Sequence, residues 1–103
     1  VEAKTLMDDA LPMGSMIELH QYGRQLLGMK QAQEALKVFK TNYDKNPDQF
    51  TTNVGLGRGY SANGEYKKAL EHMKAALTQA PDDLNKNSVA AMIKKLEAGK
   101  DVN

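Results

Sequence analysis

Two arginines, Arg24 and Arg58, have the clearest potential for chemistry in this sequence. A guanidinium group presents fixed N–H donors that match a carboxylate or another oxyanion through paired hydrogen bonds. If the fold brings both arginines together, they could hold an anion between them. The alternative is that each arginine is solvated or paired with an acid such as Glu18 or Glu65, because exposed ion pairs are common and weak.

The two histidines, His20 and His72, are the next candidates, because imidazole serves in metal binding and in acid–base catalysis. Neither lies in an HExxH pattern or beside further ligands, and the chain has no cysteine for a thiolate site. No nucleophile with an adjacent base and no phosphate-binding loop is present. We therefore expect no catalytic activity, no metal and no cofactor.

The elements that would position these side chains are helices, because apolar residues recur at helical spacing throughout. Ser15 and Glu18 fit a capping box at the start of the first helix. Pro47 and Pro81 end two later helices. The expected helices span about residues 16–29, 31–45, 49–62, 65–79 and 83–98. The sequence therefore predicts an all-α fold.

The two ends of the sequence carry weaker patterns. Residues 1–13 have a loose helical pattern and form a lead-in that ends at Pro12. Gly99 suits the C-cap of the last helix. We expect the tail, residues 99–103, to be frayed beyond that cap.

Residues 14–47 recur as residues 48–81, at a constant offset of 34 positions. The matching pairs are Met16 and Phe50, Tyr22 and Leu56, Gly23 and Gly57, Arg24 and Arg58, Leu26 and Tyr60, Ala35 and Ala69, Leu36 and Leu70, Phe39 and Met73, Tyr43 and Leu77, Pro47 and Pro81, and Asp48 and Asp82. A fixed period of this length indicates stacked helical repeats. It also places Arg24 and Arg58 side by side on adjacent helices.

Three glycines, Gly55, Gly57 and Gly59, lie in the third expected helix. Their spacing does not fit the GxGxxG dinucleotide fingerprint, and no strand precedes them. Each costs a helix about 0.8–1 kcal/mol relative to alanine. Gly57 has a packing role because the repeat conserves it at Gly23. Gly55 and Gly59 either make room for a partner backbone or loosen the helix, and we favour loosening.

The repeated unit resembles the tetratricopeptide repeat (TPR), over about residues 14–98 of the chain. The second copy carries the resemblance in Leu56, Gly57, Tyr60, Gly64, Tyr66, Ala69, Ala76 and Pro81. The first copy keeps Gly23, Ala35, Phe39 and Pro47. It departs at Lys30, where the turn usually has glycine, and at Asn42, which is usually small and apolar. The resemblance implies a right-handed array of two antiparallel hairpins, 14–47 and 48–81, closed by a capping helix, 83–98.

In this family the first helices of successive hairpins line a concave groove that binds peptides or partner segments. By the resemblance, the groove residues here are His20, Gln21, Arg24, Leu27, Thr51, Val54, Arg58, Ser61, Ser88 and Met92. Some members grip a C-terminal carboxylate with a set of Lys, Asn and Arg residues. That set is not reproduced, because His20 and Val54 occupy two of the places, and we do not predict that specificity.

Composition limits the remaining classes of protein. The chain has 103 residues, the size of one domain, and its net charge of +1 gives no steering toward nucleic acid. No apolar run is long enough for a membrane span, and the start of the chain does not have the pattern of a signal peptide. At a looser level, the run from Gly55 onward resembles repeat tails of some exported bacterial proteins. That likeness favours a periplasmic or secreted parent over a cytoplasmic one.

We therefore predict a protein–protein interaction module that docks a peptide, helix or companion domain in its groove. The alternative is a structural tail that packs on its own parent domain or dimerises. Apolar edges near residues 1–16 and on the last hairpin favour this alternative. An enzyme ranks far below both.

Overall fold

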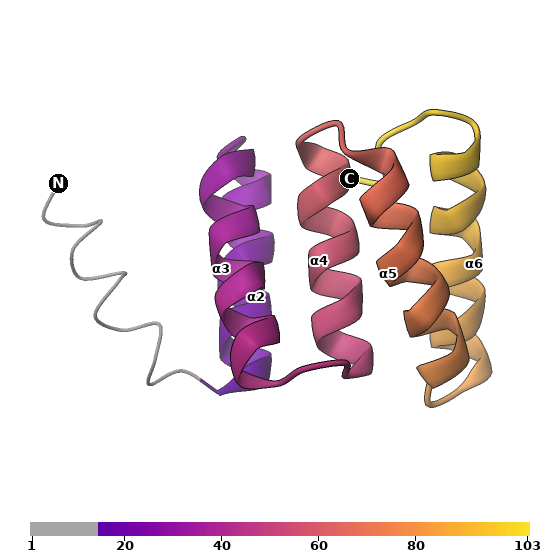
Figure 1. The fold of residues 1–103 in the computed structure, drawn as a ribbon, viewed down its shortest axis with the longest axis horizontal. Coiled ribbons are helices and arrows are strands. Elements are labelled where there is room, and N and C mark those ends of the chain that lie inside the picture. The colour runs from indigo at the N-terminus through magenta and orange to yellow at the C-terminus, as the bar shows by residue number, and fades with distance from the viewer. Residues whose placement is uncertain (1–14) are drawn as a thin grey trace, which may run out of the picture.

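The computed structural model describes residues 15–103, and the lead-in expected at 1–13 lies outside them. Within the described residues the chain forms helices and no strand, so the prediction of an all-α helical array is confirmed. The helices are α2 (Met16–Gly28), α3 (Ala32–Lys45), α4 (Phe50–Ala62), α5 (Tyr66–Gln79) and α6 (Asp83–Glu97). Figure 1 shows α2 and α3 as one layer, α4 in the middle, and α5 and α6 beyond it.

The start of α2 is fixed by the predicted capping box. The Ser15 hydroxyl accepts from the Glu18 backbone N–H at 3.1 Å, and the Glu18 carboxylate accepts from the Ser15 N–H at 3.2 Å. Two N–H groups that the helix cannot satisfy internally are thereby paired. These hydrogen bonds also lower the pKa of Glu18, which keeps its side chain in the charged form that the cap needs.

Asn42 explains the second departure of the first repeat from the family pattern. Its side chain is fully buried and donates to the Met16 backbone carbonyl at 2.9 Å. Asn46 donates to the Asn42 side-chain oxygen at 3.0 Å. A polar group can be buried here because both ends of the amide are hydrogen-bonded. The equivalent position in the second repeat, Ala76, is buried without such partners.

Two apolar clusters hold the helices together on either side of α4. The first consists of Leu19, Leu26, Ala35, Val38, Phe39 and Leu56. The second consists of Val54, Ala69, Met73, Ala76, Val89, Met92, Ile93, Leu96 and Val102. Phe39 and Met73 occupy equivalent places in the two repeats, and both are almost completely buried. Each hairpin is therefore completed by its neighbour, as in stacked repeats.

The glycines of α4 make this packing possible. A Cβ at Gly55 would lie 2.7 Å from Cδ1 of Phe39, and one at Gly57 would lie 2.6 Å from Cε of Met73. A Cβ at Gly59 would approach the Phe39 ring to 3.0 Å. The interpretation that Gly55 and Gly59 loosen the helix is therefore wrong. They let α4 approach the large side chain of the neighbouring hairpin.

The expectation that the tail is frayed is also wrong. Residues 101–103 return to α4, and the end of the described chain lies beside this helix in Figure 1. The Val102 side chain is only 8% exposed and belongs to the second apolar cluster. Its backbone N–H donates to the Ser61 hydroxyl at 2.9 Å. Burial of one aliphatic side chain and pairing of backbone groups hold the segment in place.

Candidate groove on the first helices

A hollow of about 360 Å³ lies among α2, α4 and α6. Of the predicted groove residues, His20, Arg24, Thr51, Val54, Arg58, Ser88 and Met92 line it. Phe50, Asn85 and Val89 complete its walls. The 34-residue repeat brings Arg24 and Arg58 to the same hollow. We call this hollow the α2–α4–α6 groove.

Three predicted residues lie outside this lining. Gln21 is exposed on α2, and Leu27 is half-buried against the first apolar cluster. Ser61 is buried beneath residues 101–103, to which it is hydrogen-bonded. The tail thus covers the end of α4 that sequence reasoning assigned to the groove.

Sequence reasoning missed three lining residues, Phe50, Asn85 and Val89. Phe50 and Val89 follow the apolar spacing of core positions, and each also has contacts with the second apolar cluster. Asn85 lies in the first turn of α6, where its backbone N–H donates to the capping Asp82 at 2.8 Å. The only signal for these three is helical spacing from predicted groove residues. Phe50 lies four residues before Val54, Asn85 lies three before Ser88, and Val89 lies three before Met92.

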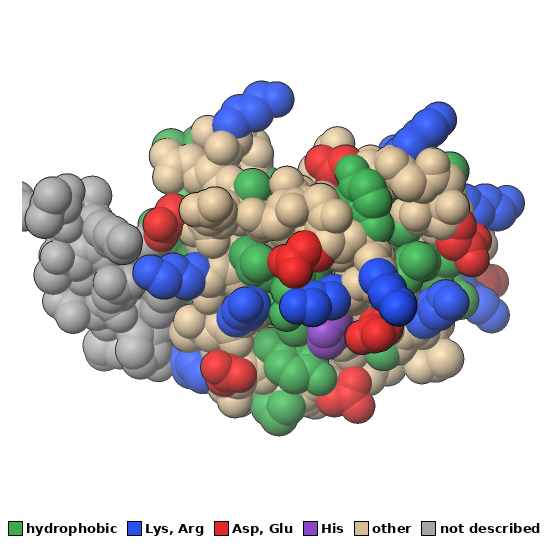
Figure 2. Space-filling model, turned by 45° about the horizontal axis from the view of Figure 1, so that its top comes forward, with side chains coloured by type: hydrophobic (Ala, Val, Ile, Leu, Met, Phe, Trp, Pro, Cys, Tyr) green, Lys and Arg blue, Asp and Glu red, His purple; other side chains and the backbone are tan. Residues whose placement is uncertain are grey.

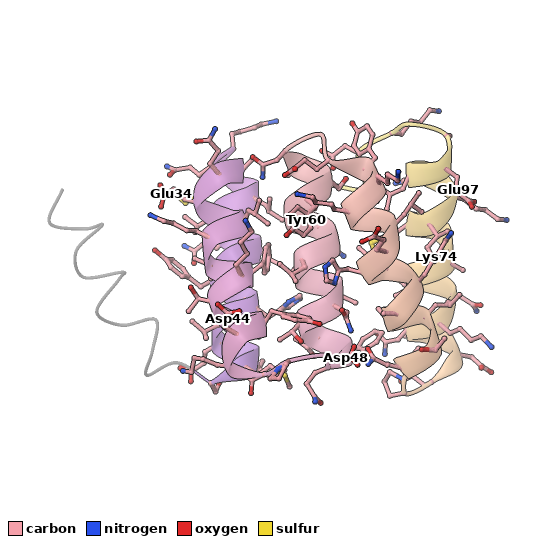
Figure 3. All side chains as sticks on the ribbon, viewed as in Figure 1. Glu34, Asp44, Asp48, Tyr60, Lys74 and Glu97 are labelled. Atoms are coloured by element: carbon pink, nitrogen blue, oxygen red, sulfur yellow. The ribbon has the colours of Figure 1, made fainter. Side chains whose placement is uncertain are left out.

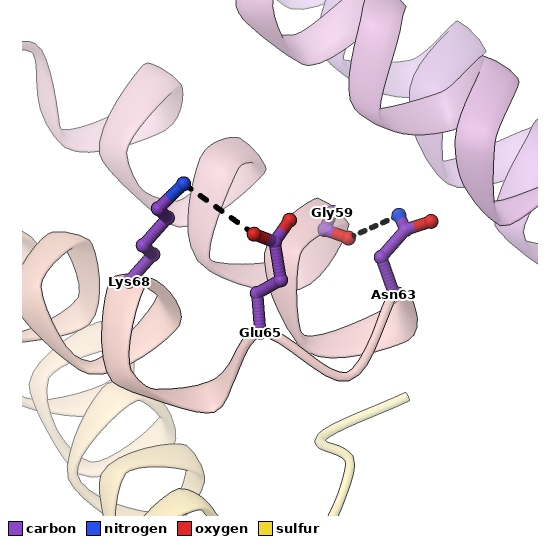
Figure 4. Close-up of polar contacts among 4 residues, drawn as sticks. All are labelled: Gly59, Asn63, Glu65 and Lys68. Carbon is purple, nitrogen blue, oxygen red and sulfur yellow. Dashed lines mark hydrogen bonds and ion pairs between the residues drawn. The ribbon is translucent and has the colours of Figure 1, made fainter.

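Arg58 is half-buried in the groove, and its buried Nε has no hydrogen-bond partner among residues 15–103. Burial lowers the pKa of Arg58, and the nearby Arg24 charge lowers it further. The two acids considered as alternative partners are engaged elsewhere. Glu18 caps α2, and Glu65 pairs with Lys68 at 3.4 Å (Figure 4). Arg58 is therefore a partly desolvated cation with an unused donor.

His20 lies beside the arginines and is mostly shielded from solvent. Its ring centroid is 5.7 Å from that of Phe39, and its Nδ1 is buried with no hydrogen-bond partner in the described part of the chain. Burial lowers the pKa of His20 to about 4, with further contributions from Arg24 and Arg58. The imidazole is therefore neutral at pH 7. It adds a polar group to the groove, and the smaller part of its pKa shift comes from the positive charges of Arg24 and Arg58.

Among residues 15–103, the side chains that line the groove include two arginines and no acid. Concave surfaces lined by one sign of charge concentrate ions of the opposite sign. The chemistry of this lining therefore suits a ligand with a carboxylate or another anion, flanked by apolar groups that contact Val54 and Met92. In contrast, Figure 2 shows a face on which basic, acidic and hydrophobic side chains are interspersed.

A second hollow, of about 290 Å³, lies among α3, α4 and α5. It is lined by Lys40, Tyr43, Asp44, Leu56, Tyr60 and His72. Figure 3 labels Asp44 and Tyr60 on this side of the molecule. The Tyr60 ring stacks on His72 at 5.8 Å between centroids, with Lys40 and Lys68 over its face at 5.7 and 5.5 Å. The Tyr43 ring of the first hairpin also lies edge-on to His72, at 5.5 Å between centroids, so His72 packs between the two hairpins.

A buried amide, Asn53, fixes the orientation of His72. The Asn53 amide donates to Asp48 Oδ1 and to Gln79 Oε1, both at 2.9 Å. Its oxygen is therefore directed at Nδ1 of His72, 2.9 Å away, and Nδ1 must carry the proton. Burial lowers the pKa of His72, while Glu71 and Asp48 act in the opposite direction. The two histidines thus lie in separate environments.

Within residues 15–103, no group of His, Cys, Asp or Glu is arranged to hold a metal ion. Among the helices described, none is both long enough and apolar enough to cross a membrane.

Comparison with known proteins gives one family. The family model described as Tetratricopeptide repeat matches residues 26–93. The match extends from the end of α2 into α6, so it includes both turns between the paired helices. No curated protein and no solved structure matches the chain.

Proposed function

Because this chain belongs to the tetratricopeptide repeat family, we propose that it is an interaction module whose α2–α4–α6 groove binds an acidic segment of a partner protein. Members of the family generally mediate protein–protein interaction. The acidic character of the ligand is inferred from the groove itself.

The observation that carries this proposal is the buried, unpaired Nε of Arg58 beside Arg24. A desolvated cation without an anion is unfavourable, and a carboxylate bound between two guanidinium groups relieves this cost. The groove has a volume of about 360 Å³, which accommodates one or two side chains of a peptide. An aspartate or glutamate would meet the arginines, and a neighbouring apolar residue would contact Val54 and Met92.

The test compares labelled peptides that contain either Glu or Gln at the same positions. We expect the Glu peptides to bind and the combined change Arg24→Ala and Arg58→Ala to weaken binding by about tenfold or more, with the domain still folded. The matched control is Lys67→Ala with Lys74→Ala, which removes the same charge from exposed positions of α5. Equal binding of Glu and Gln peptides, or equal losses in both double variants, would contradict the proposal.

The alternative function is a structural contact with a parent domain or a second copy. Within residues 15–103, the exposed large apolar side chains are Ile17, Met29 and Leu84, and Leu84 is 81% exposed on α6. If this surface drives association, the mass in solution should rise with concentration, and Leu84→Glu should abolish the rise. A monomer at all concentrations would favour the groove over self-association.

A further inference from the structure

Residues 100–103 reverse direction after α6 and return to the middle of the array. Gly99 has a φ of +74°, and the Lys100 N–H donates to the Lys95 carbonyl at 2.9 Å. This closure ends α6 and sends the following residues back toward α4 (Figure 1). The path is fixed by a left-handed glycine, which is the usual residue at such a helix end.

The polar contacts of this segment converge on Arg58 and Ser61, which lie three residues apart on one side of α4. The Ser61 hydroxyl donates to the Asp101 carboxylate and accepts from the Val102 N–H at 2.9 Å. The Asn103 side chain donates to the Arg58 carbonyl at 3.0 Å. Arg58 also lines the α2–α4–α6 groove. The segment therefore lies at the boundary of the groove and covers its continuation along α4.

The segment also has internal order. The Asp101 carboxylate accepts from the Asn103 backbone at 3.2 Å and from the Asn103 side chain at 3.0 Å. Burial raises the pKa of Asp101, but the hydrogen bonds from Ser61 and Asn103 outweigh it, so the pKa is lowered. The aspartate is thus bound as a carboxylate. One acidic side chain, Asp101, is followed by one aliphatic side chain, Val102, in a non-helical stretch, as in an extended peptide ligand.

The anchor of the segment is small. Only Val102 is buried, whereas Asp101 and Asn103 are exposed and Lys100 extends into solvent. A segment held by one aliphatic side chain and a few hydrogen bonds opens more readily than the helices beneath it. Such opening would uncover Ser61 and the Val102 site without unfolding α4.

We propose that residues 101–103 are a displaceable plug that occupies, in the same chain, one subsite of the partner groove. This rests on the proposed function, since it assigns the subsite to the same binding surface. The partner class follows from the contacts of the plug: an acidic residue followed by a β-branched aliphatic residue. Such a partner would first meet Arg24 and Arg58 and then replace the plug at Ser61.

The test uses the full chain with Val102→Asp and a synthetic peptide with the sequence of residues 98–103. The charged side chain cannot stay in the apolar site, so residues 100–103 should lose protection from hydrogen exchange while the helices keep theirs. The peptide should bind the variant about tenfold or more tightly than the unaltered chain, in which the attached plug competes at high effective concentration. The control is a peptide with the same Val→Asp change, which should bind neither protein.

A second variant, Asp101→Ala with Asn103→Ala, removes hydrogen bonds but keeps Val102, and serves if the charged variant does not fold. This second variant should also bind the peptide more tightly than the unaltered chain does. The plug proposal would be overturned if the peptide bound equally to the unaltered chain and both variants, or if it bound none of them. A different outcome would separate the two proposals. If the 98–103 peptide binds but Arg24→Ala with Arg58→Ala has no effect on the binding of acidic peptides, the groove proposal is overturned, and the plug remains an internal contact.

Discussion

Lys30 and Gly64 occupy equivalent places in the turns of the two hairpins, and both have left-handed backbones, with φ of 63° and 79°. In each turn the N–H of the next residue donates to a helix carbonyl at 2.9 Å, from Gln31 to Leu26 and from Glu65 to Tyr60. The usual turn glycine is therefore not needed to form this turn. A side chain in the left-handed region costs about 1–2 kcal/mol, so the first turn is strained.

We predict that Lys30→Gly raises the free energy of unfolding by about 0.5–1 kcal/mol, because relief of strain exceeds the greater chain entropy of glycine. Urea denaturation followed by circular dichroism would measure the change. The matched variant is Gly64→Lys, which should lower the free energy of unfolding by a similar amount. A destabilised Lys30→Gly protein would show that the lysine side chain has a stabilising contact.

A second prediction concerns Gly55, at the crossing of α4 and the Phe39 ring. We expect Gly55→Ala to destabilise the domain by about 1–3 kcal/mol, because its Cβ would overlap Phe39 in a filled core. Helix propensity alone predicts the opposite, a gain of about 1 kcal/mol. The two effects differ in sign, so a denaturation curve decides between packing and propensity.

The control for Gly55 is Gly28, where a Cβ would meet no atom within 4 Å. Gly28→Ala should be neutral or slightly stabilising, by up to about 1 kcal/mol. If Gly55→Ala also stabilises the protein, the Phe39 ring can move, and close approach is not the reason for glycine in α4.

The fold was predictable because the 34-residue repeat constrains more than any local propensity. Phe39 and Met73 identify the core through their equivalence, and the capping box of Ser15 fixes the start of α2. Gly55 was misinterpreted because a helix propensity considers one helix at a time. Its reason lies on α3, sixteen residues earlier in the chain, and only packing shows it.

The candidate site was predictable for the same reason, but the prediction was wrong at its edge, at Ser61. Arg24 and Arg58 share a hollow because they are equivalent positions of adjacent repeats. Ser61 follows the same register, but residues 101–103 lie over it. No periodicity predicts this contact, since the tail is not part of a repeat. A lone aliphatic residue such as Val102 in a polar tail was its only signal.

A third prediction follows from the depressed pKa of His20. Its folded-state value is about 4, below the ordinary value of 6.5, so between these values the unfolded chain binds a proton that the folded protein does not. The stabilising contribution is therefore present above pH 6.5 and is lost as pH falls toward 4, by about 3 kcal/mol in all. Unfolding curves of the unaltered protein and His20→Gln at pH 7 and pH 4.5 would measure the difference. The lowered pKa of His72 acts in the same direction, so His72→Gln is needed as a second comparison.

The last prediction separates the two causes that depress the pKa of His20. Burial is the larger cause, and the charges of Arg24 and Arg58 add to it. Arg24→Gln should therefore raise the pKa only part of the way from about 4 toward 6.5, because the ring stays buried beside Phe39. An NMR titration of the His20 ring protons would measure this shift. A pKa that does not move would mean that Arg24 is directed away from His20. A pKa that reaches 6.5 would mean that the His20 ring is solvated. The neighbouring arginine pair, on which the anion site depends, would then be solvated as well.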